Sequence, residues 1–396
     1  MADFKVNGFK AAAVRTGIRG KDRLDMGLIV CETPAVAAGV FTTSRVKAAP
    51  VLLDMERLAS GRIRAVLVNS GIANACSGEA GMAAAIAASQ MVADGLAVDK
   101  QEVLVSSTGV IGEQLDLACF EKGVPELIKS LSADGLADVS LAIMTTDTVP
   151  KTAVRHLEVE ARPVKIAGMA KGSGMIKPDM ATMLAFIMTD AAVEADCLRR
   201  MLRQGCDLSF NRITVDGDTS TNDSVIILAN GLAGNRPVTG ESAGSVEFTA
   251  ALNELLLDLA LQIVRDGEGA TKLVTIRVKG ARSDAEAGQA AETVANSNLV
   301  KTAFFGEDAN WGRIIGALGR SGAEFDPEKV DIAFDDVLLV EKGLGLGGAA
   351  EAAATEVMKK KEFGVNIDLK NGDCSRECYT CDFSLDYVRI NADYRS

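Results

Sequence analysis

Residues 171–184 read Lys-Gly-Ser-Gly-Met-Ile-Lys-Pro-Asp-Met-Ala-Thr-Met-Leu, and this stretch is the most informative in the chain. A glycine-rich run brings Ala181-Thr182 to the start of an apolar, strand-like segment, 183–188. Cutting the Ala181–Thr182 bond would expose a threonine α-amine, whose pKa of about 7.7–8.0 suits a general base. The one histidine, His156, lies in an alternating strand pattern that favours a structural role. A threonine that uses its own amine as base would therefore fit, although a β-branched residue beginning a buried strand is the more ordinary interpretation.

Composition limits the class of protein. The 396 residues suggest two to three domain-sized units or one large fold. The formal net charge of −12 argues against nucleic acid as a partner, because phosphate neutralisation needs basic clusters. The N-terminus has no apolar signal core, and no uncharged apolar run approaches the roughly 18 residues that a membrane span needs. We therefore expect a cytoplasmic protein that neither binds nucleic acid nor enters a membrane.

Eight cysteines are expected to be free thiols in such a compartment. Three of them, Cys374, Cys378 and Cys381, form a C-x3-C-x2-C pattern that hints at a metal site. Tetrahedral zinc usually takes four ligands, and no fourth ligand lies nearby. We expect ordinary core or surface thiols and no metal.

Strand and helix patterns alternate along the whole chain. In the first half we expect a strand at 63–68, a turn-rich loop at 69–78 and a helix at 79–96. A second strand at 103–106, a turn at 107–112 and a helix at 116–131 should follow. In the second half, four leucines (Leu252, Leu255, Leu256 and Leu259) and Ile263 form one apolar helical face that stops at 266–269. Residues 272–279 alternate as a half-buried strand, Ser283 and Glu286 form a capping box, and 330–334 and 337–340 are further strands.

One glycine-rich segment imitates a nucleotide-binding motif. Residues 343–348, Gly-Leu-Gly-Leu-Gly-Gly, match G-x-G-x-x-G between an expected strand and an expected helix. The match arises easily in a chain with 38 glycines. A tight turn that allows close helix packing is the favoured interpretation. The polar loop with Asp216, Asp218, Asn222 and Asp223 lacks EF-hand spacing, so we interpret these residues as turn and network residues.

The segment 171–184 resembles the signature of the ornithine acetyltransferase (glutamate N-acetyltransferase) family, which acts in arginine biosynthesis. The resemblance covers nearly the whole chain, and so many ordered matches make chance an inadequate explanation. The further matching segments are 39–43, Ala49-Pro50, 69–74, 107–112, 144–148, 214–219, 308–313 and 387–394.

The resemblance implies an α/β protein of layered sheets and helices, an α-β-β-α sandwich of the self-processing N-terminal-nucleophile kind. It implies self-cleavage into an α chain, 1–181, and a β chain, 182–396, with two α and two β chains in the assembly. The implied reaction moves an acetyl group from N2-acetylornithine to glutamate by a ping-pong mechanism through acetyl-threonine. Acetyl-CoA is a possible second donor, and no cofactor is implied.

Residue roles follow from the same resemblance. Thr182 matches the nucleophile, and the Thr108 hydroxyl and Gly109 backbone N–H match the oxyanion hole. By themselves, residues 107–109 favour an ordinary turn at the end of a strand. The positions that match substrate-binding residues of the family are Thr148, Lys171, Thr182, Glu268, Asn391 and Ser396, the last replacing an expected threonine.

The implied substrates explain why this set mixes charges. Both carry an α-carboxylate, whereas their side chains end in an ammonium and in a carboxylate. Lys171 could pair with a carboxylate and Glu268 with an ammonium. Without the resemblance, Lys171 would more often be a solvated charge and Glu268 a loop carboxylate.

Three alternatives remain open from the sequence. The first is an aminopeptidase of related self-processing architecture. The second is an uncleaved nucleotide-dependent binding or oxidoreductase domain built on residues 343–348. The third is a non-catalytic interaction protein. The sequence has no repeat, basic patch or low-complexity tail that would support this alternative.

Overall fold

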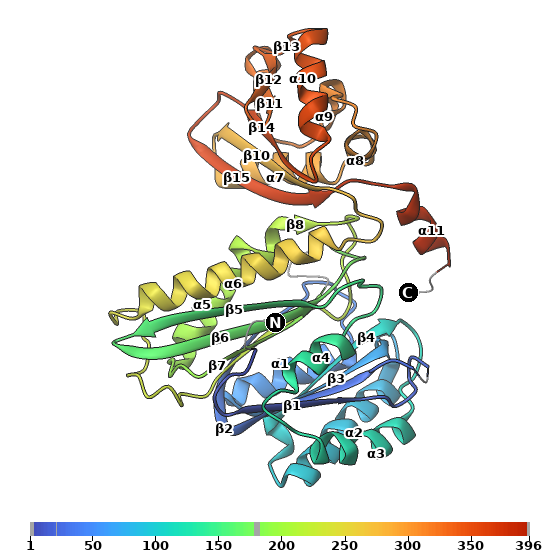
Figure 1. The fold of residues 1–396 in the computed structure, drawn as a ribbon, viewed down its shortest axis with the longest axis vertical. Helices are drawn as coiled ribbons and strands as arrows, with labels where there is room; N and C mark the ends of the chain where they lie inside the picture. The colour runs from blue at the N-terminus through green and yellow to red at the C-terminus, as the bar shows by residue number, and fades with distance from the viewer. Residues whose placement is uncertain (1–3, 21, 178–182, 394–396) are drawn as a thin grey trace. The chain divides into compact units, whose positions relative to one another are not determined.

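The computed structural model describes residues 4–20, 22–177 and 183–393 (Figure 1). In this described part the chain forms two compact units. The first runs through Asn211 and takes up Asp218–Ile263, and the second takes up Arg212–Gly217 and the chain from Val264 onward.

A mixed sheet forms the centre of the first unit. Its strand order is β4-β3-β2-β9-β7-β6-β5, and β1 also pairs with β2. The pairs β3–β4 and β7–β9 are parallel, and the other strand pairs of this sheet are antiparallel. The strands are β1 Phe9–Val14, β2 Met26–Phe41, β3 Arg62–Ile72, β4 Val103–Val110, β5 Lys151–Val159, β6 Arg162–Lys171, β7 Leu184–Thr189 and β9 Ser224–Ala229.

Helices lie on the outer sides of this sheet. They are α1 Ala49–Arg57, α2 Gly78–Leu96, α3 Leu117–Lys129, α4 Leu136–Ala142, α5 Ala195–Leu208 and α6 Ser245–Arg265, with the short 3-10 turns Leu58–Ser60, Lys100–Glu102 and Phe210–Arg212. Figure 1 shows α2 and α3, then β1–β3, then β5–β7, then α5 and α6 as successive layers.

The layers arise because β2 serves both halves of the sheet. Its first part pairs with β1 and β3, and its last residues pair with β9. One apolar cluster joins Val66 and Leu104 from one half to Phe186 and Ile226 from the other, so the two halves face each other. The expected α-β-β-α sandwich is confirmed for this unit.

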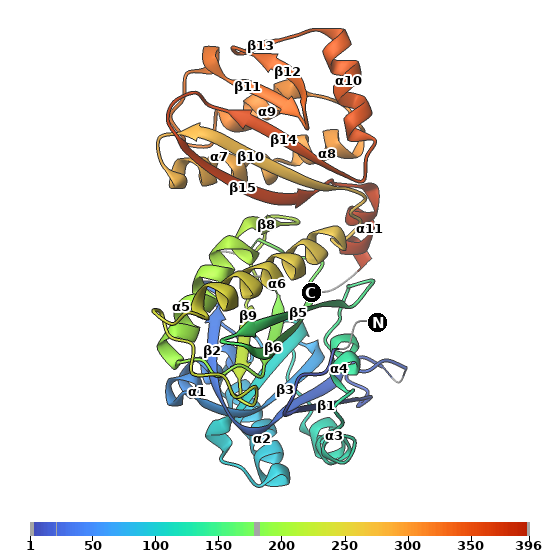
Figure 2. The ribbon, with the colours of Figure 1, turned by 60° about the vertical axis from the view of Figure 1, so that its left-hand side comes forward.

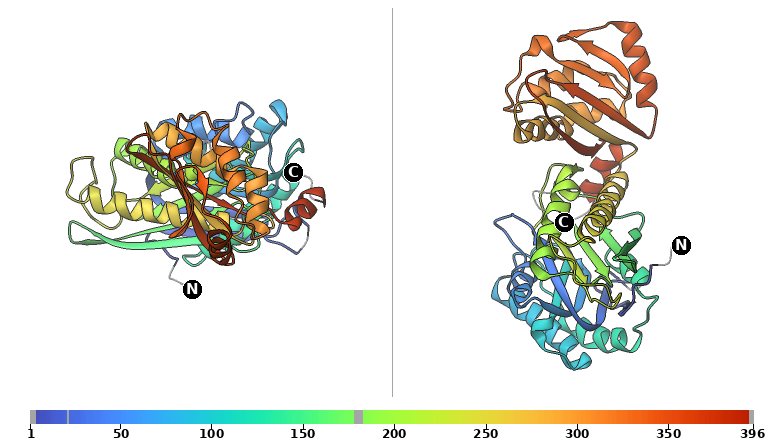
Figure 3. Two further views of the ribbon diagram at one scale, coloured as in Figure 1. Left: turned by 90° about the horizontal axis from the view of Figure 1, so that it is seen from above. Right: turned by 90° about the vertical axis from the view of Figure 1, so that its left-hand side faces the viewer.

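Each outer helix layer packs through small and branched residues. Helices α2 and α3 share a second cluster with Leu28 and Leu67. On the other side, a β-carbon on Gly168 would lie 2.8 Å from Leu255, so this glycine lets α6 approach β6 closely. Helices α5 and α6 lie side by side (Figure 3).

The second unit contains a second sheet with helices packed against it (Figure 2). Alternate residues such as Ile276 and Val365 enter a core with helix residues, whereas Arg277 pairs with Glu377 at 2.6 Å. The strand order is β13-β12-β11-β14-β10-β15-β8. The elements are β8 Ile213–Thr214, β10 Leu273–Ala281, β11 Asp331–Phe334, β12 Val337–Glu341, β13 Leu344–Gly345, β14 Glu362–Asp368, β15 Cys374–Cys381, α7 Asp284–Ala295, α8 Asn298–Phe305, α9 Trp311–Leu318, the 3-10 turn Pro327–Lys329, α10 Gly348–Met358 and α11 Leu385–Asp393.

Most expected elements are confirmed within a few residues: α2, α3, α6, β10, β11 and β12 occupy the expected positions. Ser283 caps α7 by accepting the Glu286 N–H at 3.2 Å. Two expectations at the ends of strands are wrong. The loop expected from 69 begins only after Ile72, and the turn expected at 107–112 is strand up to Val110. In both places the parallel β3–β4 pairing outweighs the local turn preference of Ser, Asn and Gly.

Candidate active site

The candidate site begins where β3 and β4 end together. Their register places Ser70 opposite Thr108 and Gly71 opposite Gly109. Gly109 has φ of 133°, and a β-carbon there would lie 2.2 Å from the Gly71 carbonyl carbon. Glycine is therefore required at this position by close approach of two strands, and not by the turn expected from the sequence.

Thr108 meets the predicted substrate-binding lysine. Lys171, the last residue of β6, donates from Nζ to Thr108 Oγ1 at 3.3 Å. Both side chains are buried, with 8% of Lys171 and 9% of Thr108 exposed, so the solvated lysine expected from residue type alone is wrong. A hydroxyl that accepts from an ammonium keeps its own O–H for another acceptor, and the cation strengthens it as a donor.

A buried carboxylate, Asp147, organises the charges around Lys171. Its Oδ1 accepts Lys151 Nζ at 2.6 Å and the Gly172 N–H at 2.7 Å. Burial alone would raise the pKa of Asp147, but Lys171 and Lys151 lower it to about 2. Asp147 is therefore ionised at neutral pH. Thr148, the predicted substrate-binding residue that follows it, is exposed.

Cations outnumber ionised carboxylates here. Arg19 donates to the carbonyls of Met144 and Thr145, the latter at 2.8 Å, and its charge acts on Lys171. Burial lowers the pKa of Lys171, Asp147 opposes this, and the positive charges of Lys151 and Arg19 add to the lowering. The surroundings of Thr108 therefore favour developing negative charge.

Side chains from α1 hold the outer edge of β4. This strand ends the sheet, so its outward backbone groups have no strand partner in the order found. Arg57 donates to the Val103 carbonyl, and Asp54 Oδ1 accepts the Val105 N–H at 2.9 Å. Both side chains are almost fully buried.

The same edge continues toward Gly109. Asn222 Nδ2 donates to the Ser107 carbonyl at 2.8 Å. Successive residues of a strand direct their backbone groups to alternate sides, so 103, 105, 107 and 109 share the outer edge. The Gly109 N–H consequently falls on this edge, in the residue that follows Thr108.

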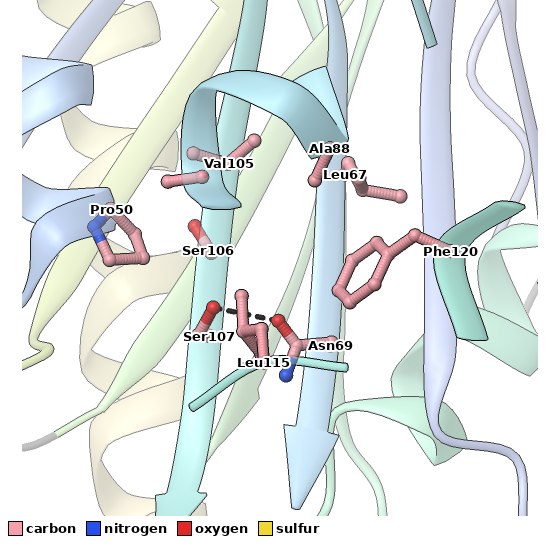
Figure 4. A pocket seen from close by; sticks show the side chains of 10 residues that line it. Pro50, Leu67, Asn69, Ala88, Val105, Ser106, Ser107, Leu115 and Phe120 are labelled. Atoms are coloured by element: carbon pink, nitrogen blue, oxygen red, sulfur yellow. Dashed lines mark hydrogen bonds between the residues drawn. The ribbon is translucent and has the colours of Figure 1, made fainter. Parts of the chain in front are cut away.

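A small cavity lies on the helix side of the same strands (Figure 4). Its walls are mostly apolar and include Leu67, Val105 and Phe120. Ser107 Oγ donates to Asn69 Oδ1 at 2.7 Å across it, joining β4 to β3 one residue before Thr108 (Figure 4). We assign this cavity to packing behind the site.

The remaining predicted residues fall into two groups. In the second unit, Asn391 Nδ2 donates to Glu268 Oε2 at 2.8 Å, and Glu268 is 7% exposed. Ala181, Thr182 and Ser396 lie outside the described residues.

Sequence reasoning did not single out Asp147, Lys151 or Arg19, and it interpreted Asn222 and Asp223 only as turn and network residues. Asp147 lies within a segment that matched the family, 144–148. Charged or amide side chains directly before an apolar strand, as in Asn222-Asp223 before β9, are the signal that could have found the last two.

The glycine motif at 343–348 does not form a nucleotide-binding turn. Strand β12 is antiparallel to both of its neighbours, β11 and β13, whereas a dinucleotide fingerprint needs adjacent parallel strands. A β-carbon on Gly345 would lie 2.8 Å from the Trp311 ring, so this glycine makes room for an indole. The tight-turn interpretation is confirmed, and the nucleotide-binding alternative is not supported.

The cysteine pattern has a similarly ordinary environment. Cys378 enters the core of the second unit, whereas Cys381 Sγ lies 3.6 Å from Lys301 Nζ. Among the described residues, no three His, Cys, Asp or Glu side chains are grouped so that they could hold a metal ion. In the same residues, no helix combines the length and apolar character that crossing a membrane requires.

A hydroxyl and a backbone N–H beside a buried cation, at the end of a parallel strand pair, are groups that can donate hydrogen bonds to a developing oxyanion. Comparison with known proteins identifies the family of the chain. The ArgJ family model matches residues 10–396. The arginine biosynthesis bifunctional protein ArgJ of Desulfotalea psychrophila is 55% identical over 99% of this chain and 100% of its own length.

Two solved structures are similar to this chain to different extents. The crystal structure of arginine biosynthesis bifunctional protein ArgJ from Bacillus halodurans is 45% identical, with a TM-score of 0.52, and covers 54% of this chain and 100% of that chain. Ornithine acetyltransferase from Mycobacterium tuberculosis, complexed with ornithine, is 38% identical, with a TM-score of 0.41 over 45% of this chain and 97% of that chain. By the family match and the identity with the Desulfotalea psychrophila protein, the chain belongs to the ArgJ family, and it is an acyltransferase of arginine biosynthesis.

Proposed function

We propose that the chain moves an acetyl group from N2-acetylornithine to glutamate through an acetyl-Thr182 intermediate. The observation that carries this proposal is the hydrogen bond from Lys171 Nζ to Thr108 Oγ1, next to the outward edge of β4 at Gly109. Two donors held at fixed positions beside a cation stabilise a tetrahedral oxyanion without reorganising during the reaction. The family membership supplies the acyl-transfer chemistry that needs such an oxyanion.

The proposed reaction has two halves. Thr182 Oγ attacks the acetyl carbonyl while the α-amine of Thr182 takes its proton, and the Thr108 O–H and Gly109 N–H donate to the oxygen that becomes negative. The C–N bond then breaks, and the amine of ornithine leaves with a proton from the same α-amine. In the second half the glutamate amine attacks the carbonyl of acetyl-Thr182 and gives a proton to the α-amine of Thr182; the bond from the acetyl carbon to Oγ then breaks, Oγ regains a proton from the α-amine, and acetylglutamate leaves.

Lys171 has a proposed part in both binding and chemistry. The resemblance pairs it with a substrate carboxylate, and its hydrogen bond supports a second effect on Thr108. Because the ammonium is buried and faces Asp147, its field acts with little screening by water. We propose that this field makes the Thr108 hydroxyl a stronger donor to the oxyanion.

The substrate-binding roles of the other residues remain part of the proposal. A buried carboxylate, Glu268, suits an ammonium group, and the amide of Asn391 fixes one of its oxygens. We propose that these two residues bind substrate and that Thr148 and Ser396 do so as their matches to the family suggest. Acetyl-CoA is proposed as a second acetyl donor, and no bound cofactor is needed for these steps.

Maturation by self-cleavage at Ala181–Thr182 is also proposed, giving two α and two β chains in the cytoplasm. The matched Bacillus halodurans chain supports the division. The comparison covers 100% of the Bacillus halodurans chain but only 54% of this chain. Residues 182–396 make up about the same fraction of this chain.

Intact-mass measurement of the purified protein tests the proposal directly. We expect two fragments that meet at Ala181/Thr182, and one unbroken chain for Thr182→Ala, together with acetyl transfer from N2-acetylornithine to glutamate in the wild type only. A wild type that transfers acetyl groups while unbroken would exclude the terminal amine as base. Release of amino acids from peptides without acetyl transfer would favour the aminopeptidase instead.

A further inference from the structure

Two adjacent buried residues, Asn222 and Asp223, lie between the strands that carry the proposed catalytic groups. They directly precede β9 and are 6% and 1% exposed. Neither has a role in the mechanism proposed above. Each contacts a different strand, which gives the pair a function that neither residue would have alone.

Asn222 faces β4. Its Nδ2 donates to the carbonyl of Ser107 at 2.8 Å and to the carbonyl of Ala73 at 2.6 Å, and its Oδ1 accepts from Thr221 Oγ1 at 2.7 Å. The Ser107 carbonyl belongs to the peptide group that leads into Thr108. Fixing this peptide plane therefore fixes the starting direction of the residue whose hydroxyl serves the oxyanion.

Asp223 faces the beginning of β7. The backbone N–H of Met183 donates to its carboxyl, and the Met183 carbonyl accepts the Ser224 N–H at 2.9 Å. Both polar groups of the Met183 backbone are thus held by consecutive residues, 223 and 224. Met183 directly follows Thr182 in the chain.

The carboxyl of Asp223 lies in surroundings that disfavour its ionised form. Burial raises its pKa well above the ordinary value, and the Met183 N–H and the Lys171 charge only partly oppose this. Its Oδ2 has no hydrogen-bond partner among the described residues. A neutral carboxyl can still accept the Met183 N–H, so its contact with β7 does not need a negative charge.

We propose that Asn222-Asp223 is a positioning pair that sets the separation between the oxyanion donors on β4 and the beginning of β7, the strand that follows the proposed nucleophile in the chain. This inference rests on the proposed function. The reacting atoms must lie within about 3–3.5 Å in a productive complex, and a misplacement of about 1 Å can lower the rate roughly 100-fold. A rigid link between the two strands meets this requirement because both contacts come from neighbouring residues on one backbone.

Asn222→Ala tests the β4 half of the pair, with Asn235→Ala as a matched control. Asn235 is 7% exposed, in the same unit, and its side chain also makes several backbone contacts, to Ala192 and Arg236. We expect Asn222→Ala to lower kcat about 100-fold with KM within about threefold, measured on fully folded enzyme. Asn235→Ala should lose similar stability but keep kcat. Equal kcat losses in both variants would overturn the inference, as would an unchanged kcat in Asn222→Ala.

Substitutions at Asp223 test the β7 half by following self-cleavage with intact mass. Asp223→Asn keeps an oxygen for the Met183 N–H and should retain most of the processing rate, whereas Asp223→Ala should accumulate the unbroken chain. Equal processing rates in the alanine variant and the wild type would contradict the inference. If Asp223→Ala does not fold, the inference is tested by the processing rate of Asp223→Asn and by the comparison of kcat between Asn222→Ala and Asn235→Ala. An unbroken, inactive wild type would instead refute the proposed function itself.

Discussion

At the scale of single residues, Lys171 and Asp147 determine the electrostatics of the site. Each is more than nine-tenths buried, and the charge of each acts on the other. A buried cation without a partner would lose its proton, so the carboxylate preserves the charge that Thr108 contacts. The pair therefore couples the stability of the fold to the chemistry of the site.

The pH dependence of acetyl transfer should report Lys171. Burial lowers its pKa from 10.5, so the ammonium loses its proton at a lower pH than an exposed lysine. If the positive charge is needed, activity falls as pH rises through that value. Arginine stays protonated, so Lys171→Arg should move the alkaline decline to higher pH, while Lys129→Arg at an exposed helix position should not. Identical alkaline limbs for all three enzymes would show that the charge of Lys171 is not required.

Asp147 should make the free energy of unfolding decrease at acidic pH. Its pKa in the folded protein, about 2, lies below the ordinary 3.8, so the stabilisation is complete above about pH 4 and is lost as pH falls through 2. The shift corresponds to about 2 kcal/mol. Urea unfolding between pH 5 and pH 2 should show this loss in the wild type and in Asp336→Asn, an exposed control, and not in Asp147→Asn. Removing the carboxylate should also destabilise the protein by about 3–5 kcal/mol at pH 7.

At the scale of elements, β4 is the strand on which the site depends. Its backbone, rather than its side chains, makes the close approach to β3 at Gly109 and Gly71. Helix α1 and Asn222 then occupy the outer edge up to Ser107. The strand is therefore fixed on both edges immediately before its proposed catalytic residues.

Gly109→Ala should abolish acetyl transfer and strongly destabilise the protein. The added carbon would lie 2.2 Å from the Gly71 backbone at a φ of 133°, so the strands must separate. Gly112→Ala is the control, because it has φ of 86° and nothing lies within 4 Å of its β-carbon. That variant should lose only about 1 kcal/mol and remain active. Thermal unfolding and kcat together measure the difference; a soluble, active Gly109→Ala would refute the close approach.

The sequence predicts this element only in part. The apolar run at 103–106 correctly indicates a strand, but Ser107-Thr108-Gly109 has the composition of a turn. The strand continues because it pairs with Ser70, Gly71 and Ile72 some 38 residues earlier in the chain, and local preference contains no information about that partner. The burial of Lys171 escapes sequence reasoning for the same reason, since Asp147 and Thr108 come from distant segments.

At the scale of the whole molecule, the family resemblance correctly indicates the α-β-β-α sandwich, and the sequence pattern locates its helices α2, α3 and α6 but not α1, α4 and α5. The division of the chain into two compact units is harder to predict from the sequence than the positions of these elements. The segment Arg212–Gly217 adds β8 to the second unit although both its chain neighbours belong to the first. A two-residue strand paired through a long-range contact gives no periodic signal.

Thiol accessibility tests the fold of the whole chain. Cys76 is exposed, Cys119 and Cys374 are half-buried, and the other five cysteines are buried. Burial raises the pKa of Cys31 and Cys381, which makes these thiols less reactive. A maleimide should label Cys76 first and at most the two half-buried thiols later, whereas all eight react after denaturation. Cys76→Ser should remove the fastest phase. Additional labelling after treatment with a chelator would reveal a metal-bound thiol and contradict the free-thiol arrangement.

The side chains that hold the outer edge of β4 have a further consequence, for association between molecules. An edge strand with unpaired N–H and C=O groups can recruit a strand from another chain and start aggregation. Here Arg57, Asp54 and Asn222 already occupy the outward groups of Val103, Val105 and Ser107. A foreign strand would have to displace three buried side chains before it could pair. In the proposed mechanism the next group on this edge, the Gly109 N–H, is reserved for the carbonyl of a small substrate, so the same edge excludes other strands and admits the acetyl group.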